Sequence, residues 1–204
     1  NIFPQLKLWR WRKFCKKEVY FFSELNERSF TLAKSINKTD SENSVIIFAN
    51  VNKSKGAFIE FYCKEVKRFG AICLSDNITH IKKQCKGNKK LFLINDDEIE
   101  NLQILTELAD EFDKNSKNST EIYLFCQDYA YIDIEKQFRA KFNEKCAPVV
   151  IPVRHYRNLI TNMLETTPLY EPIVHKQKED RILNVTILGI GDIGTEMFLN
   201  TYWI

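Results

Sequence analysis

Three glycines near the end of the chain have the spacing of a phosphate-binding loop. Gly189, Gly191 and Gly194 form a Gly-x-Gly-x-x-Gly pattern in the run "VTILGIGDIGTEMFL", with Asp192 and Ile193 between the last two glycines. An apolar, β-branched run precedes the motif and a helical pattern follows it, which is the context in which such loops bind nucleotides. The glycines let backbone N–H groups approach a pyrophosphate at the helix N-terminus. We therefore predict that these five residues contact a cofactor.

The remainder of such a site is not contained in the sequence. The acidic residue that binds the ribose hydroxyls is expected about 20 residues after the glycines, which places it beyond Ile204. We therefore expect no cofactor on the chain by itself, and NAD(H) or an adenine nucleotide in a longer protein that completes the unit.

A second set of polar residues lies at the ends of earlier predicted strands. The turn after the first strand, Ser23–Ser29, has no glycine, and its Glu24 and Glu27 would repel a phosphate. The second strand ends in Asn50-Val51-Asn52, without the carboxylate that takes the ribose. We predict a degenerate ligand site that comprises Ser23, Glu24, Asn26, Arg28, Asn50, Ser75, Asp76, Asn95 and Asp96.

The elements that position these residues alternate between short apolar runs and helical spacing. The runs predict strands at residues 19–22, 45–49, 71–74, 89–94, 121–126 and 148–152. The helical patterns predict helices at residues 26–36, 58–69, 77–85, 97–113, 132–142 and 154–165. This alternation predicts an α/β fold, a doubly wound, mostly parallel Rossmann-like sheet with helices on both faces.

The same pattern predicts the order of parts along the chain. Residues 18–153 form the main domain, residues 154–180 a crossover helix and linker, and residues 181–204 the truncated start of a second Rossmann unit whose first strand begins at Ile182.

Composition excludes several classes of function. The net charge of +3 over 204 residues is too small and diffuse for a nucleic-acid-binding protein. The six cysteines and three histidines stand singly, so we predict reduced thiols of a cytoplasmic protein and no metal site. No spacing suggests a nucleophile–base pair, and we predict no catalytic residues.

The lead-in segment, residues 1–17, is basic and aromatic. Six cations alternate with Trp9, Trp11 and Phe14 between Leu6 and Lys17. This composition is typical of a belt at the cytoplasmic surface of a membrane. An amphipathic helix packed on its own domain explains it equally well.

Three runs resemble one known family. "RFGAICLSDNITHIKKQC", "KLFLINDDEIENLQILTELADEF" and "TEIYLFCQ" are similar to the RCK domain, which regulates the conductance of potassium channels and has the fold of the NAD-binding module of Trk-type uptake regulators. The resemblance covers about residues 18–165, although the glycines of the first turn are missing.

The resemblance implies a regulatory role. It implies a cytosolic ligand-sensing or gating domain of a potassium channel-like or transporter-like membrane protein, with a pore domain upstream of residue 1. It implies a location at the cytosolic face of the membrane, and a homodimer or higher homo-oligomer formed through the helix at residues 154–165. RCK domains often occur in tandem, so the glycine loop would open the second one.

Two other interpretations remain. One is a fragment of an NAD-dependent oxidoreductase, and the other is an assembly scaffold without a ligand. Asp97 and the pair Ser75-Asp76 also suit helix N-caps, a structural role that needs no ligand.

Overall fold

The chain consists of two units, Asn1–Pro152 and Val153–Ile204, and each is described by itself. The computed structural model describes residues 18–52, 58–80, 88–111, 120–127, 131–142, 148–171, 184–189 and 191–202. The basic aromatic lead-in, residues 1–17, lies outside the described residues.

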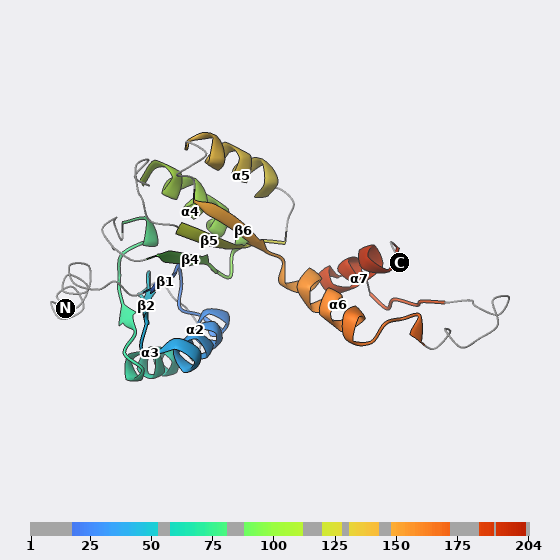
Figure 1. Cartoon of the computed structure of the whole chain (residues 1–204), viewed down its shortest axis with the longest axis horizontal. Helices are drawn as coiled ribbons and strands as arrows, with labels where there is room; N and C mark the ends of the chain where they lie inside the picture. The colour runs from blue at the N-terminus through green and yellow to red at the C-terminus, as the bar shows by residue number, and fades with distance from the viewer. Residues whose placement is uncertain are drawn as a thin grey trace. The chain divides into compact units, whose positions relative to one another are not determined.

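Six strands form one parallel sheet, whose order is β3-β2-β1-β4-β5-β6 (Figure 1). Its central strands pair in register, with Phe22 opposite Phe48 on one side and Phe92 on the other. This order is that of a dinucleotide-binding Rossmann sheet, and the predicted fold class is confirmed. The strands are β1 (Glu18–Phe22), β2 (Ser44–Phe48), β3 (Ile72–Cys73), β4 (Lys89–Leu93), β5 (Thr120–Phe125) and β6 (Val149–Val153).

Helices cover both faces of this sheet. α2 and α3 pack on one face, and the short 3-10 helix η1 packs on the other with α4 and α5. Figure 1 shows α2 and α3 below the strands and α4 and α5 above them. The bounds are α2 (Glu27–Asp40), α3 (Ile59–Arg68), η1 (Ile78–His80), α4 (Glu98–Glu111) and α5 (Tyr131–Ala140).

The core consists of two layers, one on each face of the sheet. Successive side chains along a strand point to opposite faces and therefore belong to different layers. In β1, Val19 and Phe21 belong to the layer under α4 and α5, while Tyr20 and Phe22 belong to the layer under α2 and α3. A central strand buried on both faces reads as a continuous apolar run, which is why it could be recognised from sequence.

A row of aromatic rings crosses the sheet on the side of α2 and α3. Phe22 stacks on Phe48 at 5.0 Å and on Phe92 at 4.9 Å between ring centroids, and Phe92 stacks on Tyr123 at 4.7 Å. Such contacts stabilise a fold beyond simple burial, by about 0.5–1.5 kcal/mol per pair.

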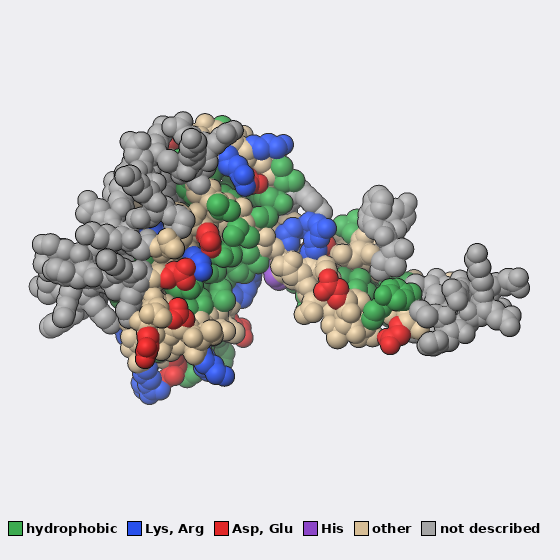
Figure 2. All heavy atoms as spheres, in the orientation of Figure 1, with side chains coloured by type: hydrophobic (Ala, Val, Ile, Leu, Met, Phe, Trp, Pro, Cys, Tyr) green, Lys and Arg blue, Asp and Glu red, His purple; other side chains and the backbone are tan. Residues whose placement is uncertain are grey.

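The far end of this aromatic face is open. Val149 on β6 is 52% exposed, and Tyr123, Phe125 and Ile151 are half-buried. In Figure 2, hydrophobic side chains gather on the surface beside β5 and β6. The described helices on this side, α2 and α3, belong to the β1–β3 half of the sheet.

Two predicted elements differ in the structure. Of the helix expected at residues 77–85, the described residues form a 3-10 turn, Ile78–His80, and residues 81–85 lie outside the described part. The strand expected from Ile182 is wrong where it can be examined, because residues 184–189 have no strand pairing. A strand exists only through hydrogen bonds to a neighbour, so an apolar run without a paired neighbour is not a strand.

In the described part of the second unit, α6 (His155–Thr166) and α7 (Asp192–Tyr202) pack against each other. Arg154, just before α6, forms an ion pair with Glu196 on α7, and both side chains are buried. No helix within the described ranges has both the length and the apolar composition that a membrane span requires.

Candidate functional site

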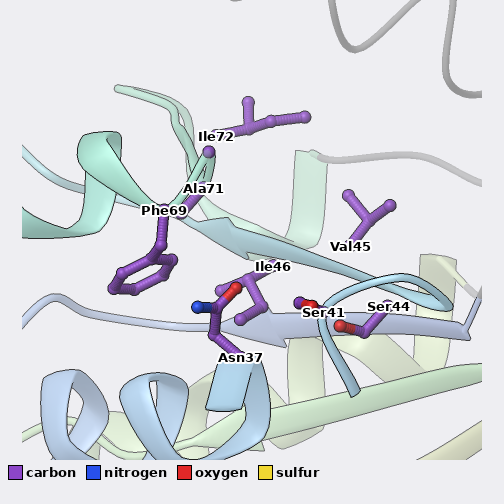
Figure 3. Close-up of a pocket in the computed structure, with 9 residues that line it drawn as sticks. Asn37, Ser41, Ser44, Val45, Ile46, Phe69, Ala71 and Ile72 are labelled. Carbon is purple, nitrogen blue, oxygen red and sulfur yellow. The ribbon is translucent and has the colours of Figure 1, made fainter. Parts of the chain in front are cut away.

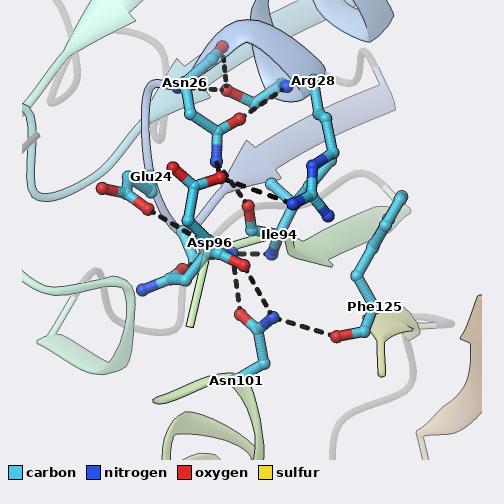
Figure 4. Close-up of polar contacts among 10 residues, drawn as sticks. Glu24, Asn26, Arg28, Ile94, Asp96, Asn101 and Phe125 are labelled. Carbon is cyan, nitrogen blue, oxygen red and sulfur yellow. Dashed lines mark hydrogen bonds and ion pairs between the residues drawn. The ribbon is translucent and has the colours of Figure 1, made fainter. Parts of the chain in front are cut away.

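The sheet changes its direction of winding between β1 and β4. The chain builds β1, β2 and β3 toward one edge, and β4 then returns to pair with β1. In such sheets, ligands bind in the crevice outside the carboxyl ends of these two strands. Here the β1–α2 turn and the β4–α4 turn bound that crevice. Figure 4 shows the polar contacts that join the two turns.

Ser23 ties the end of β1 to the end of β4. Its hydroxyl donates to Oδ1 of Asn95 and accepts from the backbone N–H of Ile94 at 2.9 Å. Its backbone N–H donates to the carbonyl of Phe92 at 2.9 Å. Because Ser23 and Asn95 are buried and bonded to each other, they hold the two strand ends together.

Asn26 occupies the helix end that a phosphate would need. As the N-cap of α2, its Oδ1 accepts from the backbone N–H of Ser29 at 2.9 Å, and the Ser29 hydroxyl accepts from the Asn26 backbone N–H. Its amide nitrogen donates to the carbonyl of Ile94 at 2.7 Å and to the carboxylate of Asp96 at 3.1 Å. The capping box therefore satisfies N–H groups that a phosphate-binding turn leaves for its ligand.

Asn101 on α4 is a further member of this network, and the predicted site did not include it. Its side chain accepts from the backbone N–H of Asn95 at 2.8 Å and donates to the carbonyls of Asn95 at 3.1 Å and Phe125 at 3.0 Å. It is fully buried. The sequence carries a signal, since Asn101 shares the apolar helical stripe of Leu105 and Leu108.

The open side of the crevice carries negative charge. The carboxylate of Glu24 accepts from the backbone N–H of Asp96 at 3.3 Å. Burial raises the pKa of Glu24, and the neighbouring charges of Asp96 and Glu100 raise it further. The exposed Arg28 guanidinium lies 3.6 Å from the Asp96 carboxylate. Carboxylates outnumber cations here, so this surface repels a phosphate.

The other predicted residues form a separate group at the ends of β2 and β3. The backbone N–H of Asn50 donates to the carbonyl of Asp76 at 3.0 Å, and the Asn52 amide donates to the Ser75 hydroxyl at 2.9 Å. Asn50 has a φ of +51°, a left-handed conformation that Asn tolerates well. The degenerate site therefore comprises two groups, and only the first one joins β1 to β4.

The two helix caps expected from sequence have different outcomes. Asp97 does cap α4, because its carboxylate accepts from the backbone N–H of Ile99 at 2.9 Å. The expectation that Ser75-Asp76 caps the following turn is wrong. Asn77 does so, accepting from the backbone N–H of Thr79 at 3.3 Å. An Asx side chain one residue closer to the turn reaches its N–H groups more directly.

No family model, curated protein or solved structure matches this chain.

The glycine loop lies in the second unit and has the backbone of a tight turn. Gly189 has a φ of +101°, which favours glycine. A Cβ on Gly194 would collide with the carbonyl oxygen of Gly189, so a side chain has no room there. α7 begins at Asp192, and the backbone N–H of Thr195 donates to the carbonyl of Gly191 at 2.8 Å. Ile193 is 50% exposed.

An open groove of about 590 Å³ runs between this loop and α6. Its walls are mostly apolar. Among the described residues that line it, the charged one is Asp192, at the N-terminus of α7. The lining includes Tyr156, Ile160, Met163, Val185, Ile187, Gly191 and Asp192.

Replacing Gly194 by Ala is expected to displace the glycine loop. The added Cβ meets a backbone oxygen, and overpacking of this kind costs about 1–3 kcal/mol. Amide hydrogen exchange of the first turns of α7 should accelerate by about tenfold or more. Gly191→Ala is the matched control, because a Cβ there meets nothing within 4 Å. Equal exchange rates in the two variants would contradict this geometry.

The helix expected to join two copies exposes part of its apolar surface. On α6, Ile160 is buried while Leu159 is 56% and Met163 44% exposed. Leu159 and Met163 are four residues apart and therefore lie on the same side of the helix.

Metal-ligating groups do not cluster within the described ranges. No group of three or more His, Cys, Asp or Glu side chains there is placed to hold an ion. Cys63, Cys73 and Cys126, the cysteines in those ranges, belong to no such group.

Proposed function

We propose that this chain is a regulatory module, a ligand-sensing or gating domain, and that it is not an enzyme. In this proposal the first unit transmits conformational change, and the glycine loop of the second unit belongs to the sensor. The observation that carries the proposal is the side-chain network at the β1–β4 crevice.

The network supports a transmitting role because it replaces a ligand with the chain's own groups. Ser23, Asn26, Asn95 and Asn101 are buried and bonded across the crevice. A dinucleotide at this position would have to break these bonds and approach Glu24 and Asp96. An oxidoreductase that uses this crevice is therefore the weaker alternative.

The second unit supports a nucleotide site that further strands complete. The segment 184–189 is rich in strand-forming residues but unpaired, and Leu188 is 94% exposed. Its turn has the glycine geometry that lets a helix begin close to the segment that precedes it. We propose that Gly189, Gly191, Asp192, Ile193 and Gly194 contact NAD(H) or an adenine nucleotide in a longer protein.

Partners and location follow from the resemblance to RCK domains. We propose a pore domain before residue 1, as in a potassium channel-like or transporter-like protein, reached through the basic aromatic lead-in. We propose further that Leu159 and Met163 of α6 contribute to a homodimer, since both are exposed and apolar.

Calorimetric titration with NAD(H), ADP and ATP tests the proposal. It should be done on this chain and on a version extended past Ile204 through a complete second unit. Binding by the extended chain alone is the expected result. Binding by the short chain, abolished by Asn26→Ala, would place a ligand in the β1–β4 crevice and overturn the proposal.

An assembly scaffold is the second candidate, and the open face beside β5 and β6 favours it. Val149 is exposed there, next to half-buried Ile151 and Tyr123. Apolar surface that a chain leaves uncovered often marks a protein interface. The scaffold predicts no nucleotide binding by either version of the chain.

A further inference from the structure

We propose that a cavity at the amino-terminal edge of the first sheet binds an uncharged planar ring of nucleobase size. The cavity lies between the C-terminal end of α2 and the segment that joins α3 to β3 (Figure 3). This edge is opposite to the one that carries the β1–β4 crevice, so the proposal is independent of the function proposed above.

The size of the cavity limits its ligand. Its volume is about 200 Å³. Engineered apolar cavities of about 150 Å³ take up benzene, and pockets for drug-sized ligands begin near 300 Å³. The space therefore suits one small ring system with polar substituents, and it excludes a complete nucleotide.

The walls have two different chemistries. Val45, Ile46, Phe69 and Ile72 supply apolar surface, while Asn37, Ser41 and Ser44 supply polar groups. None of the described residues that line the cavity is charged. A ligand with one apolar face and one hydrogen-bonding edge matches this division, and a charged ligand would find no counter-ion.

Asn37 is the group that would recognise the polar edge. Its carboxamide offers two N–H donors and an acceptor oxygen, and the structure gives it no hydrogen-bonding partner among the described residues. Figure 3 shows the amide pointing into the space between the Phe69 ring and Ile46. An asparagine amide pairs with the N6 and N7 edge of adenine through two hydrogen bonds. The ring of Phe69 lies beside it as a stacking surface.

The cavity is preformed because local hydrogen bonds fix both of its walls. On one side, the Ser44 hydroxyl donates to the carbonyl of Asp40 at the end of α2. On the other, the backbone N–H groups of Gly70 and Ala71 donate to the carbonyls of Lys67 and Val66 at 3.1 and 3.0 Å. Gly70, at a φ of +86°, places no side chain across the opening.

Adenine is the probe that tests this site. Added at millimolar concentration to ¹⁵N-labelled chain, it should shift amide signals saturably, with a Kd on the order of 1 mM or tighter. The shifts should be confined to the cavity walls, at Ser41, Ser44, Gly70, Ala71 and Ile72. Shifts elsewhere only, or none, would overturn the proposal.

Two comparisons assign the recognition to Asn37. Asn37→Leu keeps the branched shape but removes the hydrogen bonds, and should weaken adenine binding about tenfold. Lys38→Leu is the matched control, since this exposed neighbour on α2 does not line the cavity, and its affinity should be unchanged. Purine lacks the amino group and should bind the unaltered chain several-fold more weakly than adenine. Equal affinity of adenine and purine would contradict pairing with Asn37 even if the Leu variant does not fold.

Discussion

Replacing Asn101 by Leu is expected to lower the free energy of unfolding of the first unit by about 3–5 kcal/mol. The change removes three hydrogen bonds and leaves the N–H and carbonyl of Asn95 and the carbonyl of Phe125 without their partner. Each buried polar group left unsatisfied costs about 1–3 kcal/mol. Leu has the same branching and the same number of heavy atoms as Asn, so loss of packing contributes little.

Urea denaturation of the unaltered chain and of the Asn101→Leu variant measures this effect. Gln103→Leu is the control, because it replaces an exposed amide on the same helix and should change stability by about 0.5 kcal/mol or less. A difference below about 1 kcal/mol between the Asn101 and Gln103 variants would show that the network does not hold the strand ends together. The crevice would then be available to a ligand, against the proposed transmitting role.

Much of the fold could be predicted because local sequence determines it. The buried parts of β1 and β4, Val19–Phe22 and Leu91–Leu93, read as continuous apolar runs since both of their faces are buried. Asp97 could be recognised as a cap because the bond that it makes reaches only two residues along the chain.

The contacts that decide the site are not local. Ser23 and Asn95 are 72 residues apart, and they meet only because β4 returns to pair with β1. The sequence shows that the turn after β1 has no glycine. It does not show that the polar side chains of this turn form hydrogen bonds across the crevice. The same limit explains the unpaired segment 184–189, since its composition favours a strand but cannot supply a neighbour.

Glu196→Leu is expected to destabilise the second unit by about 3–5 kcal/mol. Glu196 and Arg154 form an ion pair with side chains only 11% and 7% exposed. Removing the carboxylate leaves a buried guanidinium without its counter-ion, and this is far more costly than losing a surface pair. Hydrogen exchange in α6 and α7 measures the change, because it reports on this unit separately from the sheet.

The double variant distinguishes pairing from packing. Arg154→Leu combined with Glu196→Leu removes both charges, and apolar replacements of buried pairs are often neutral. The double variant should therefore regain most of the stability that Glu196→Leu loses. Asp133→Leu is the exposed control, because its partner Lys136 is also exposed, and it should cost less than about 1 kcal/mol.

The result bears directly on the glycine loop, since Glu196 lies on the helix that this loop begins. If the pair fixes α7 against α6, the Glu196 variant also displaces Gly194 and Asp192, and an extended chain should lose nucleotide affinity with it. If exchange in α6 and α7 is unchanged, the pair does not hold the helices together. Nucleotide affinity of the extended chain would then not depend on Glu196.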